Sequence, residues 1–149
     1  MAPIPVLACG KSVDIAKTVI DIVHPDYEVI HVVLNAQQGA IDIPRILSGA
    51  HPTDHTSNVG TQNYSKIPVA VVVGGGFDDA DFKLMRDACD GEGVKTVPWL
   101  RHDRSTLTGP PSKEEMAAFA KNSAERVKKL MVDLKVGMEG GTSDGVHLF

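Results

Sequence analysis

Residues 5–12, PVLACGKS, and residues 69–76, VAVVVGGG, decide the fold of this chain. Each stretch is a short apolar run that ends in glycine, which is the pattern of a strand buried on both faces of a parallel sheet. We therefore predict interior strands at 5–9 and 69–73. Because parallel strands end at a common edge, the two glycine turns are expected to meet there.

The segment after the first strand alternates between a helix pattern and a strand pattern. Ser12 can cap a helix whose apolar residues recur at helical spacing until His24-Pro25. Residues 27–34, YEVIHVVL, are rich in β-branched side chains and predict a second interior strand.

A short helix and a long loop are expected between the second and third strands. Asp42 fits the helix cap, Pro44 fits the first turn, and Gly49 fits the end. Residues 50–67 show no periodicity, and so long a loop in a compact domain is usually functional or disordered.

The second half of the chain predicts two more helices and a fourth strand. Asp78 or Asp79 can cap the third helix, and residues 94–100 read as a strand. Since Pro98 has no N–H to donate to a neighbour, we place this strand at the sheet edge.

A long final helix and an apolar tail complete the chain. Ser112 and Glu115 match a capping box that opens the helix. We divide the chain into an α/β domain, residues 1–139, and a glycine-rich linker with an apolar tail, residues 140–149. The tail is expected to dock onto its own sheet or onto a second subunit.

Alternating strands and helices predict a parallel sheet joined by right-handed crossovers. The expected fold is a three-layer α/β domain of the Rossmann-like or flavodoxin-like kind. It has four or five mostly parallel strands in the order 2-1-3-4, with helices on both faces.

Composition excludes several classes of protein. The 149 residues are 42% hydrophobic and 23% charged, as is ordinary for one globular domain. A net charge of −4, with no basic cluster outside the late helical stretch of Arg126, Lys128 and Lys129, argues against nucleic-acid binding. No apolar run approaches the ~20 residues of a membrane helix, and the start lacks the pattern of a signal peptide. We expect a cytoplasmic protein.

The candidate site is the crevice between the first and third strands, where the strand order reverses. Glycines allow a ligand to approach the backbone, and free N–H groups at a helix start attract anions. The alternative is a purely structural role, in which the glycines only make tight turns. We predict no metal site, and no catalytic residue can be named. The predicted binding residues are Gly10, Lys11, Ser12, Asn35, Gly74, Gly75, Gly76, Phe77, Asp78 and Arg101.

Residues 5–100 resemble the nucleotide-binding half of NAD(P)-binding Rossmann proteins of the short-chain dehydrogenase or NmrA-like kind. The resemblance implies NADP as the cofactor to consider. It is incomplete, because the G-x-G-x-x-G pattern counted from Gly10 meets Ser12 and Ile15. The Tyr-x-x-x-Lys pair of the dehydrogenases is also missing, since Lys66 follows Tyr64 after two residues.

Four further segments resemble those of small fungal proteins to which no activity is attached. They are residues 60–66, 74–79, 97–101 and 144–149.

Two hypotheses of function follow from these patterns. In the first, the crevice binds an anionic small molecule or a nucleotide, with a reductase-like role as one form of it. In the second, the chain is a non-catalytic interaction protein that forms a homodimer through the apolar tail and the edge strand.

Overall fold

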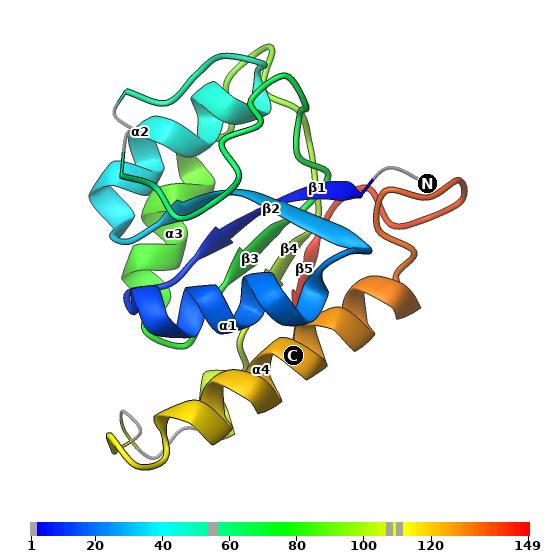
Figure 1. The fold of residues 1–149 in the computed structure, drawn as a ribbon. Coiled ribbons are helices and arrows are strands. Elements are labelled where there is room, and N and C mark those ends of the chain that lie inside the picture. The colour runs from blue at the N-terminus through cyan, green and yellow to red at the C-terminus, as the bar shows by residue number, and fades with distance from the viewer. Residues whose placement is uncertain (1–2, 54–56, 107–108, 110–111) are drawn as a thin grey trace.

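Five parallel strands form the sheet at the centre of the molecule, in the order β2-β1-β3-β4-β5 (Figure 1). The structure is a computed structural model that describes residues 3–53, 57–106, 109 and 112–149. The strands are β1 (Ile4–Cys9), β2 (Tyr27–Val33), β3 (Val71–Val73), β4 (Trp99–Arg101) and β5 (Val146–Leu148). The predicted α/β fold class is confirmed, and the tail supplies the fifth strand.

Helices cover both faces of the sheet (Figure 1). One face carries α1 (Val13–Val23) and α4 (Met116–Asp133), and the other carries α2 (Ala36–Leu47) and α3 (Asp79–Asp87). A short 3₁₀ turn, Arg104–Thr106, follows β4. None of the helices in the described part of the chain is long and apolar enough to cross a membrane.

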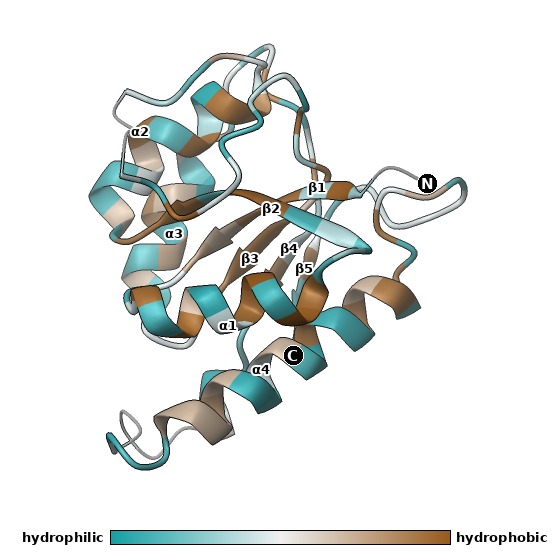
Figure 2. Cartoon of the chain, viewed as in Figure 1, coloured by the Kyte–Doolittle hydropathy of each residue, from teal (hydrophilic) through white to brown (hydrophobic). Residues whose placement is uncertain are grey.

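Alternate side chains of β1 feed two separate cores. Val6 and Ala8 pack in the core under α1 and α4, whereas Leu7 and Cys9 pack in the core under α2 and α3. Figure 2 shows that the central strands are hydrophobic along most of their length, while the helices alternate between hydrophobic and hydrophilic residues. A strand buried on both faces explains why the run at residues 5–9 shows no polar alternation.

The prediction for α2 was wrong at its start. The helix begins at Ala36, because the Asn35 side chain accepts a hydrogen bond from the N–H of Gln38 at 2.8 Å and caps it. Pro44 therefore lies inside the helix, and Asp42 is a buried residue of its middle.

The edge placement of β4 was also wrong, because β5 pairs with β4 in parallel and takes the edge. The strand is shorter than predicted and starts at Trp99, so Pro98 precedes it and no ladder hydrogen bond is lost. The N–H of Trp99 donates to the carbonyl of Gly145 at 2.8 Å. The tail thus docks onto its own sheet, and a homodimer stays a prediction.

The connection from β4 to β5 has the opposite hand to the other crossovers. The steps from β3 to β4 and from β4 to β5 run in the same direction across the sheet, but α3 and α4 lie on opposite faces. We expected right-handed crossovers throughout. The preference comes from strand twist, which has little effect in strands of three residues.

The free edge of β2 is covered by the second half of the predicted loop. The Asn58 side chain accepts from the N–H of Val32 at 2.9 Å and donates to the carbonyl of Val32 at 2.7 Å, as a neighbouring strand would. The N–H groups of Thr61 and Gln62 donate to the carbonyls of Val29 and Ile30. These contacts shield an edge that would otherwise pair with another chain.

We predict that Asn58→Ala lowers the free energy of unfolding by about 1–3 kcal/mol, because it leaves backbone groups of a buried strand unpaired. Urea denaturation measures this loss. Asn122→Ala, on the exposed side of α4, is the control and should change stability by less than about 0.5 kcal/mol. Equal effects of the two substitutions would contradict the role of Asn58.

Candidate functional site

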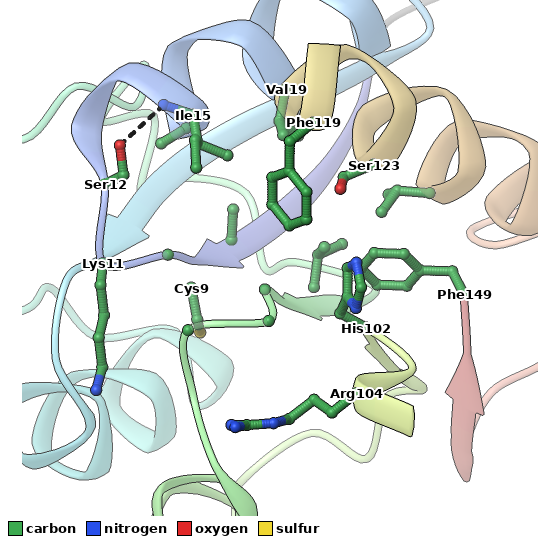
Figure 3. Close-up of a pocket in the computed structure, with 18 of the residues that line it drawn as sticks. Cys9, Lys11, Ser12, Ile15, Val19, His102, Arg104, Phe119, Ser123 and Phe149 are labelled. Atoms are coloured by element: carbon green, nitrogen blue, oxygen red, sulfur yellow. Dashed lines mark hydrogen bonds between the residues drawn. The ribbon is translucent and has the colours of Figure 1, made fainter. Parts of the chain in front are cut away.

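A cavity of about 500 Å³ lies between α1, α4 and the carboxyl ends of β1 and β3 (Figure 3). This volume is typical of a small-molecule site. Most of the lining is apolar and comes from Ala8, Ile15, Ala16, Val19, Val72, Met116, Phe119, Val127 and Phe149. The other lining residues are Cys9, Gly10, Lys11, Ser12, Gly74, Gly75, Gly76, His102, Arg104, Gly109 and Ser123.

The two glycine turns meet at one rim of this cavity. The N–H of Gly74 donates to the carbonyl of Cys9 at 2.8 Å, and a Cβ on Gly74 would lie 3.2 Å from that oxygen. The N–H of Gly10 donates to the carbonyl of Val33 at 2.9 Å. The sheet therefore uses these two amides, and they are not free for a ligand.

Four other amides of the turns remain available. The N–H groups of Lys11, Ser12, Gly75 and Gly76 have no acceptor among the described residues. They adjoin the start of α1, where Ser12 caps the helix by accepting a hydrogen bond from the N–H of Ile15. An anion at this rim would meet both the amides and the positive end of the helix dipole.

Two cations belong to the same rim. The ammonium of Lys11 lies 3.4 Å from a carboxylate oxygen of Asp81 and 5.4 Å from the centre of the Phe77 ring. Its side chain is 51% exposed, so the pair with Asp81 is weak and the ammonium can turn toward a ligand. Arg104 lines the cavity from the turn after β4.

Four of the predicted binding residues lie outside the lining of this cavity. Asn35 caps α2 and lines a separate pocket of about 180 Å³. Phe77 is fully buried in the core under α2 and α3. Asp78 caps α3 in a capping box with Asp81.

Arg101 is the fourth of these residues, and its side chain lies on the face of the sheet that carries α2 and α3. Its guanidinium pairs with Asp79 and lies 4.5 Å from the centre of the Phe82 ring. Arg101 comes directly before His102 but does not face the cavity, because successive side chains of a strand point to opposite faces.

The cavity wall around His102 is not among the predicted binding residues. His102 follows β4 directly, yet it is only 2% exposed. Its imidazole stacks on Phe119, with 5.7 Å between ring centres, and meets the edge of Phe149 at 5.4 Å. One feature of the sequence could have indicated this wall: Ser123 is a polar residue on the apolar face of α4.

The thiol of Cys9, a lining residue, points into the core under α2 and α3 and is not suited to nucleophilic chemistry. Cys9 is buried, and this burial raises the pKa of its thiol far above the usual range. The nearby thiol of Cys89 adds to the effect. Since the thiolate is the reactive form, the Cys9 thiol is inert at neutral pH.

We predict that Asn35→Ala destabilises the fold by about 1 kcal/mol, through loss of the cap of α2. Asn35→Asp keeps a side-chain acceptor at the positive end of the helix and should retain most of the stability. Chemical denaturation of the three proteins measures the difference. If Ala and Asp were equally stable at this position, Asn35 would have no capping role.

We also predict that His102 contributes to the loss of stability in mild acid. Burial and then the charge of Arg126 lower the pKa of His102 below its usual value of 6.5. The unfolded chain therefore binds this proton more readily than the folded protein, so the unfolding free energy falls as the pH drops below 6.5.

His102→Gln removes this titrating group. The unfolding free energy of the variant should depend less steeply on pH between about 7.5 and 5 than that of the wild type. Urea denaturation at several pH values gives both slopes, and identical slopes would refute the prediction.

Comparison with known proteins gives one clear relative. The protein named Kojic acid related protein 6 of Aspergillus oryzae is 31% identical over 132 residues, which cover 87% of this chain and 79% of that protein. No family model matches the chain, and no solved structure matches it significantly. The relative is fungal, in agreement with the resemblance found in the sequence, and the parallel sheet agrees with a Rossmann-like fold. The chain belongs to the family of Kojic acid related protein 6.

Proposed function

We propose that this protein binds a small molecule that has an apolar body and one negatively charged group. The observation that carries the proposal is the cavity itself, which is largely apolar inside and opens at a rim of free amides and cations. Apolar pockets with a few converging polar groups are the usual form of small-molecule sites.

The apolar body would lie between α1 and α4. Ile15 and Val19 of α1 lie on the side of Phe119 of α4 in this space (Figure 3), and Met116 of α4 also lines it. Each 100 Å² of apolar ligand surface that leaves water contributes roughly 2.5 kcal/mol before the costs of binding are subtracted. The body therefore supplies most of the affinity.

The charged group would lie at the rim. The amides of Ser12, Gly75 and Gly76 can donate to it, and Lys11 and Arg104 add positive charge. A charge at a partly exposed rim adds orientation and a modest gain in affinity, since water screens it.

NADP suits this cavity less well than a smaller acid. A dinucleotide carries polar groups along its whole length, whereas the inner lining here is mostly apolar. A reductase-like role depends on that cofactor, so NADPH belongs in the test as a separate arm. The name of the Aspergillus relative refers to kojic acid, which makes kojic acid a further probe.

The test measures the melting temperature and the dissociation constant with decanoate, naphthalene-2-carboxylate, kojic acid, ATP and NADPH. We expect the two apolar acids to raise the melting temperature, because a ligand bound only by the folded state stabilises it. Stabilisation by NADPH alone would instead support the dinucleotide hypothesis.

Two variants connect the effect to the cavity. Lys11→Gln should weaken binding of the acids by about three- to fivefold. Lys17→Gln removes the same charge from an exposed position of α1 outside the cavity and should leave binding unchanged. Ala16→Leu fills part of the cavity and should abolish binding. Absence of binding by every probe at millimolar concentration, or binding that survives Ala16→Leu, would overturn the proposal.

A further inference from the structure

The two ends of the cavity differ in chemistry. Figure 3 shows Lys11 and Ser12 on one side of the cavity, with His102 and Phe149 on the other side and Phe119 between them. The first side belongs to the rim, where the free amides lie. A ligand whose charge lies at the rim therefore directs its other end toward the side of the three rings.

The inner lining between these ends consists of hydrocarbon side chains. The two helices contribute Ile15, Ala16, Val19, Phe119 and Val127, and the sheet contributes Ala8 and Val72. None of these side chains has an atom that forms a hydrogen bond. The far end of a ligand thus meets apolar surface on the helix side and on the sheet side.

The two polar residues of this wall keep their polar atoms out of reach of an occupant. Nδ1 of His102 and Oγ of Ser123 are buried beneath the surface that faces the cavity. Nε2 of His102 is already used, because a guanidinium nitrogen of Arg126 lies 3.0 Å from it. His102 and Ser123 therefore offer carbon atoms to the cavity and no group that could bind a polar ligand atom.

The wall is also uncharged at neutral pH. Burial and then the charge of Arg126 lower the pKa of His102, and the contacts of the ring with Asp103 oppose this shift but are smaller. A polar group at the far end of a ligand would lose its water at this wall and gain no partner among the described residues. Burial of an unpaired polar group costs free energy, so the wall disfavours such a ligand.

We infer that the inner end of the cavity selects ligands whose far end is bare hydrocarbon. This inference rests on the proposed function, since it names the class of acid that the cavity takes. The class is an amphiphilic monoacid, such as a medium-chain fatty acid or an alkylated aromatic acid. Forms of the same skeleton with a hydroxyl or a second carboxylate at the far end are rejected.

The test compares isomers that differ only in the position of one hydroxyl. In 2-hydroxydecanoate the hydroxyl lies beside the carboxylate, whereas in 10-hydroxydecanoate it lies at the far end. We expect the 10-hydroxy acid to bind about ten- to hundredfold more weakly than the 2-hydroxy acid, because its buried hydroxyl has no partner. The 3-hydroxy and 6-hydroxy forms of naphthalene-2-carboxylate make the same comparison on a flat body. Calorimetry below the micellar concentration gives the dissociation constants.

Two variants connect the discrimination to the inner lining. Val19→Thr and Val127→Thr add a hydroxyl to the lining, from α1 and from α4, with little change of shape. At least one of them should reduce the penalty on the far-end hydroxyl by about threefold or more, since a hydroxyl both donates and accepts. Val132→Thr makes the same substitution on the exposed side of α4 and should keep the full penalty.

The possible failures are distinguishable, and each is judged on whichever parent acid binds. Equal binding of the two isomers would show that the inner lining does not select, and this inference would be wrong while the proposed function stands. A penalty that neither Val19→Thr nor Val127→Thr reduces, or that Val132→Thr reduces as much, also overturns the inference. If none of these acids binds, the proposed function and the inference fail together.

Discussion

The parallel pairing of β1 with β3 is the constraint on which the rest of the structure depends. The register places Leu7, Ala8 and Cys9 beside Val71, Val72 and Val73, so both strands end at the same level. The hydrogen bond from Gly74 to Cys9 closes this pairing at the edge of the sheet. Since both strands are buried on both faces, a shift in register by one residue would exchange the two cores. The glycine turns therefore have one stable position, and they form the rim of the cavity there.

The cavity exists because α4 covers the sheet only in part. This helix packs against α1 on the face that the opposite-handed connection assigns to it. Before the fully buried Met131, its first turns stand over the ends of β1 and β3 and carry Met116, Phe119 and Ser123 to the cavity. The tail follows as β5, and Phe149 closes the wall beside His102. The connection from β4 to β5 thus supplies α4, which covers the cavity, and leads to Phe149, which completes its wall.

Contacts along the β2 edge of the sheet stabilise the fold. His31 donates or accepts a hydrogen bond of 2.6 Å with the hydroxyl of Tyr64, and burial raises the pKa of Tyr64 to about 12. Asp42 is buried and accepts hydrogen bonds from Thr53 and Gln38. Lys66 pairs with Glu28 at 3.0 Å. These contacts hold the described part of the long loop against β2 and α2, which gives polar residues of that loop a structural role. Residues 54–56 of this loop lie outside the described part of the chain.

Local patterns in the sequence determined the strands, the glycine turns and the parallel α/β fold. The apolar runs at residues 5–9 and 69–73, each closed by glycine, fit strands buried inside such a sheet, and parallel strands end at a common edge. Short-range capping signals were less decisive: Asn35 and Asp42 both fit a helix start, and only the hydrogen bond to Gln38 selects Asn35. Pro98 indicated an edge strand. A local signal of this kind cannot show that a distant segment, β5, pairs with the residues after the proline.

Tertiary structure alone decided the interior of the cavity. His102, Ser123 and Phe149 come from a turn, a helix and the tail, and they share no sequence spacing that would bring them together. Their meeting depends on the face that α4 covers and on the pairing of β5 with β4, which are long-range contacts. The same holds for the burial of His102, which follows from the rings packed around it and not from its neighbours in the chain. Local residue patterns set which segments form strands, whereas packing between distant segments set which side chains face the cavity.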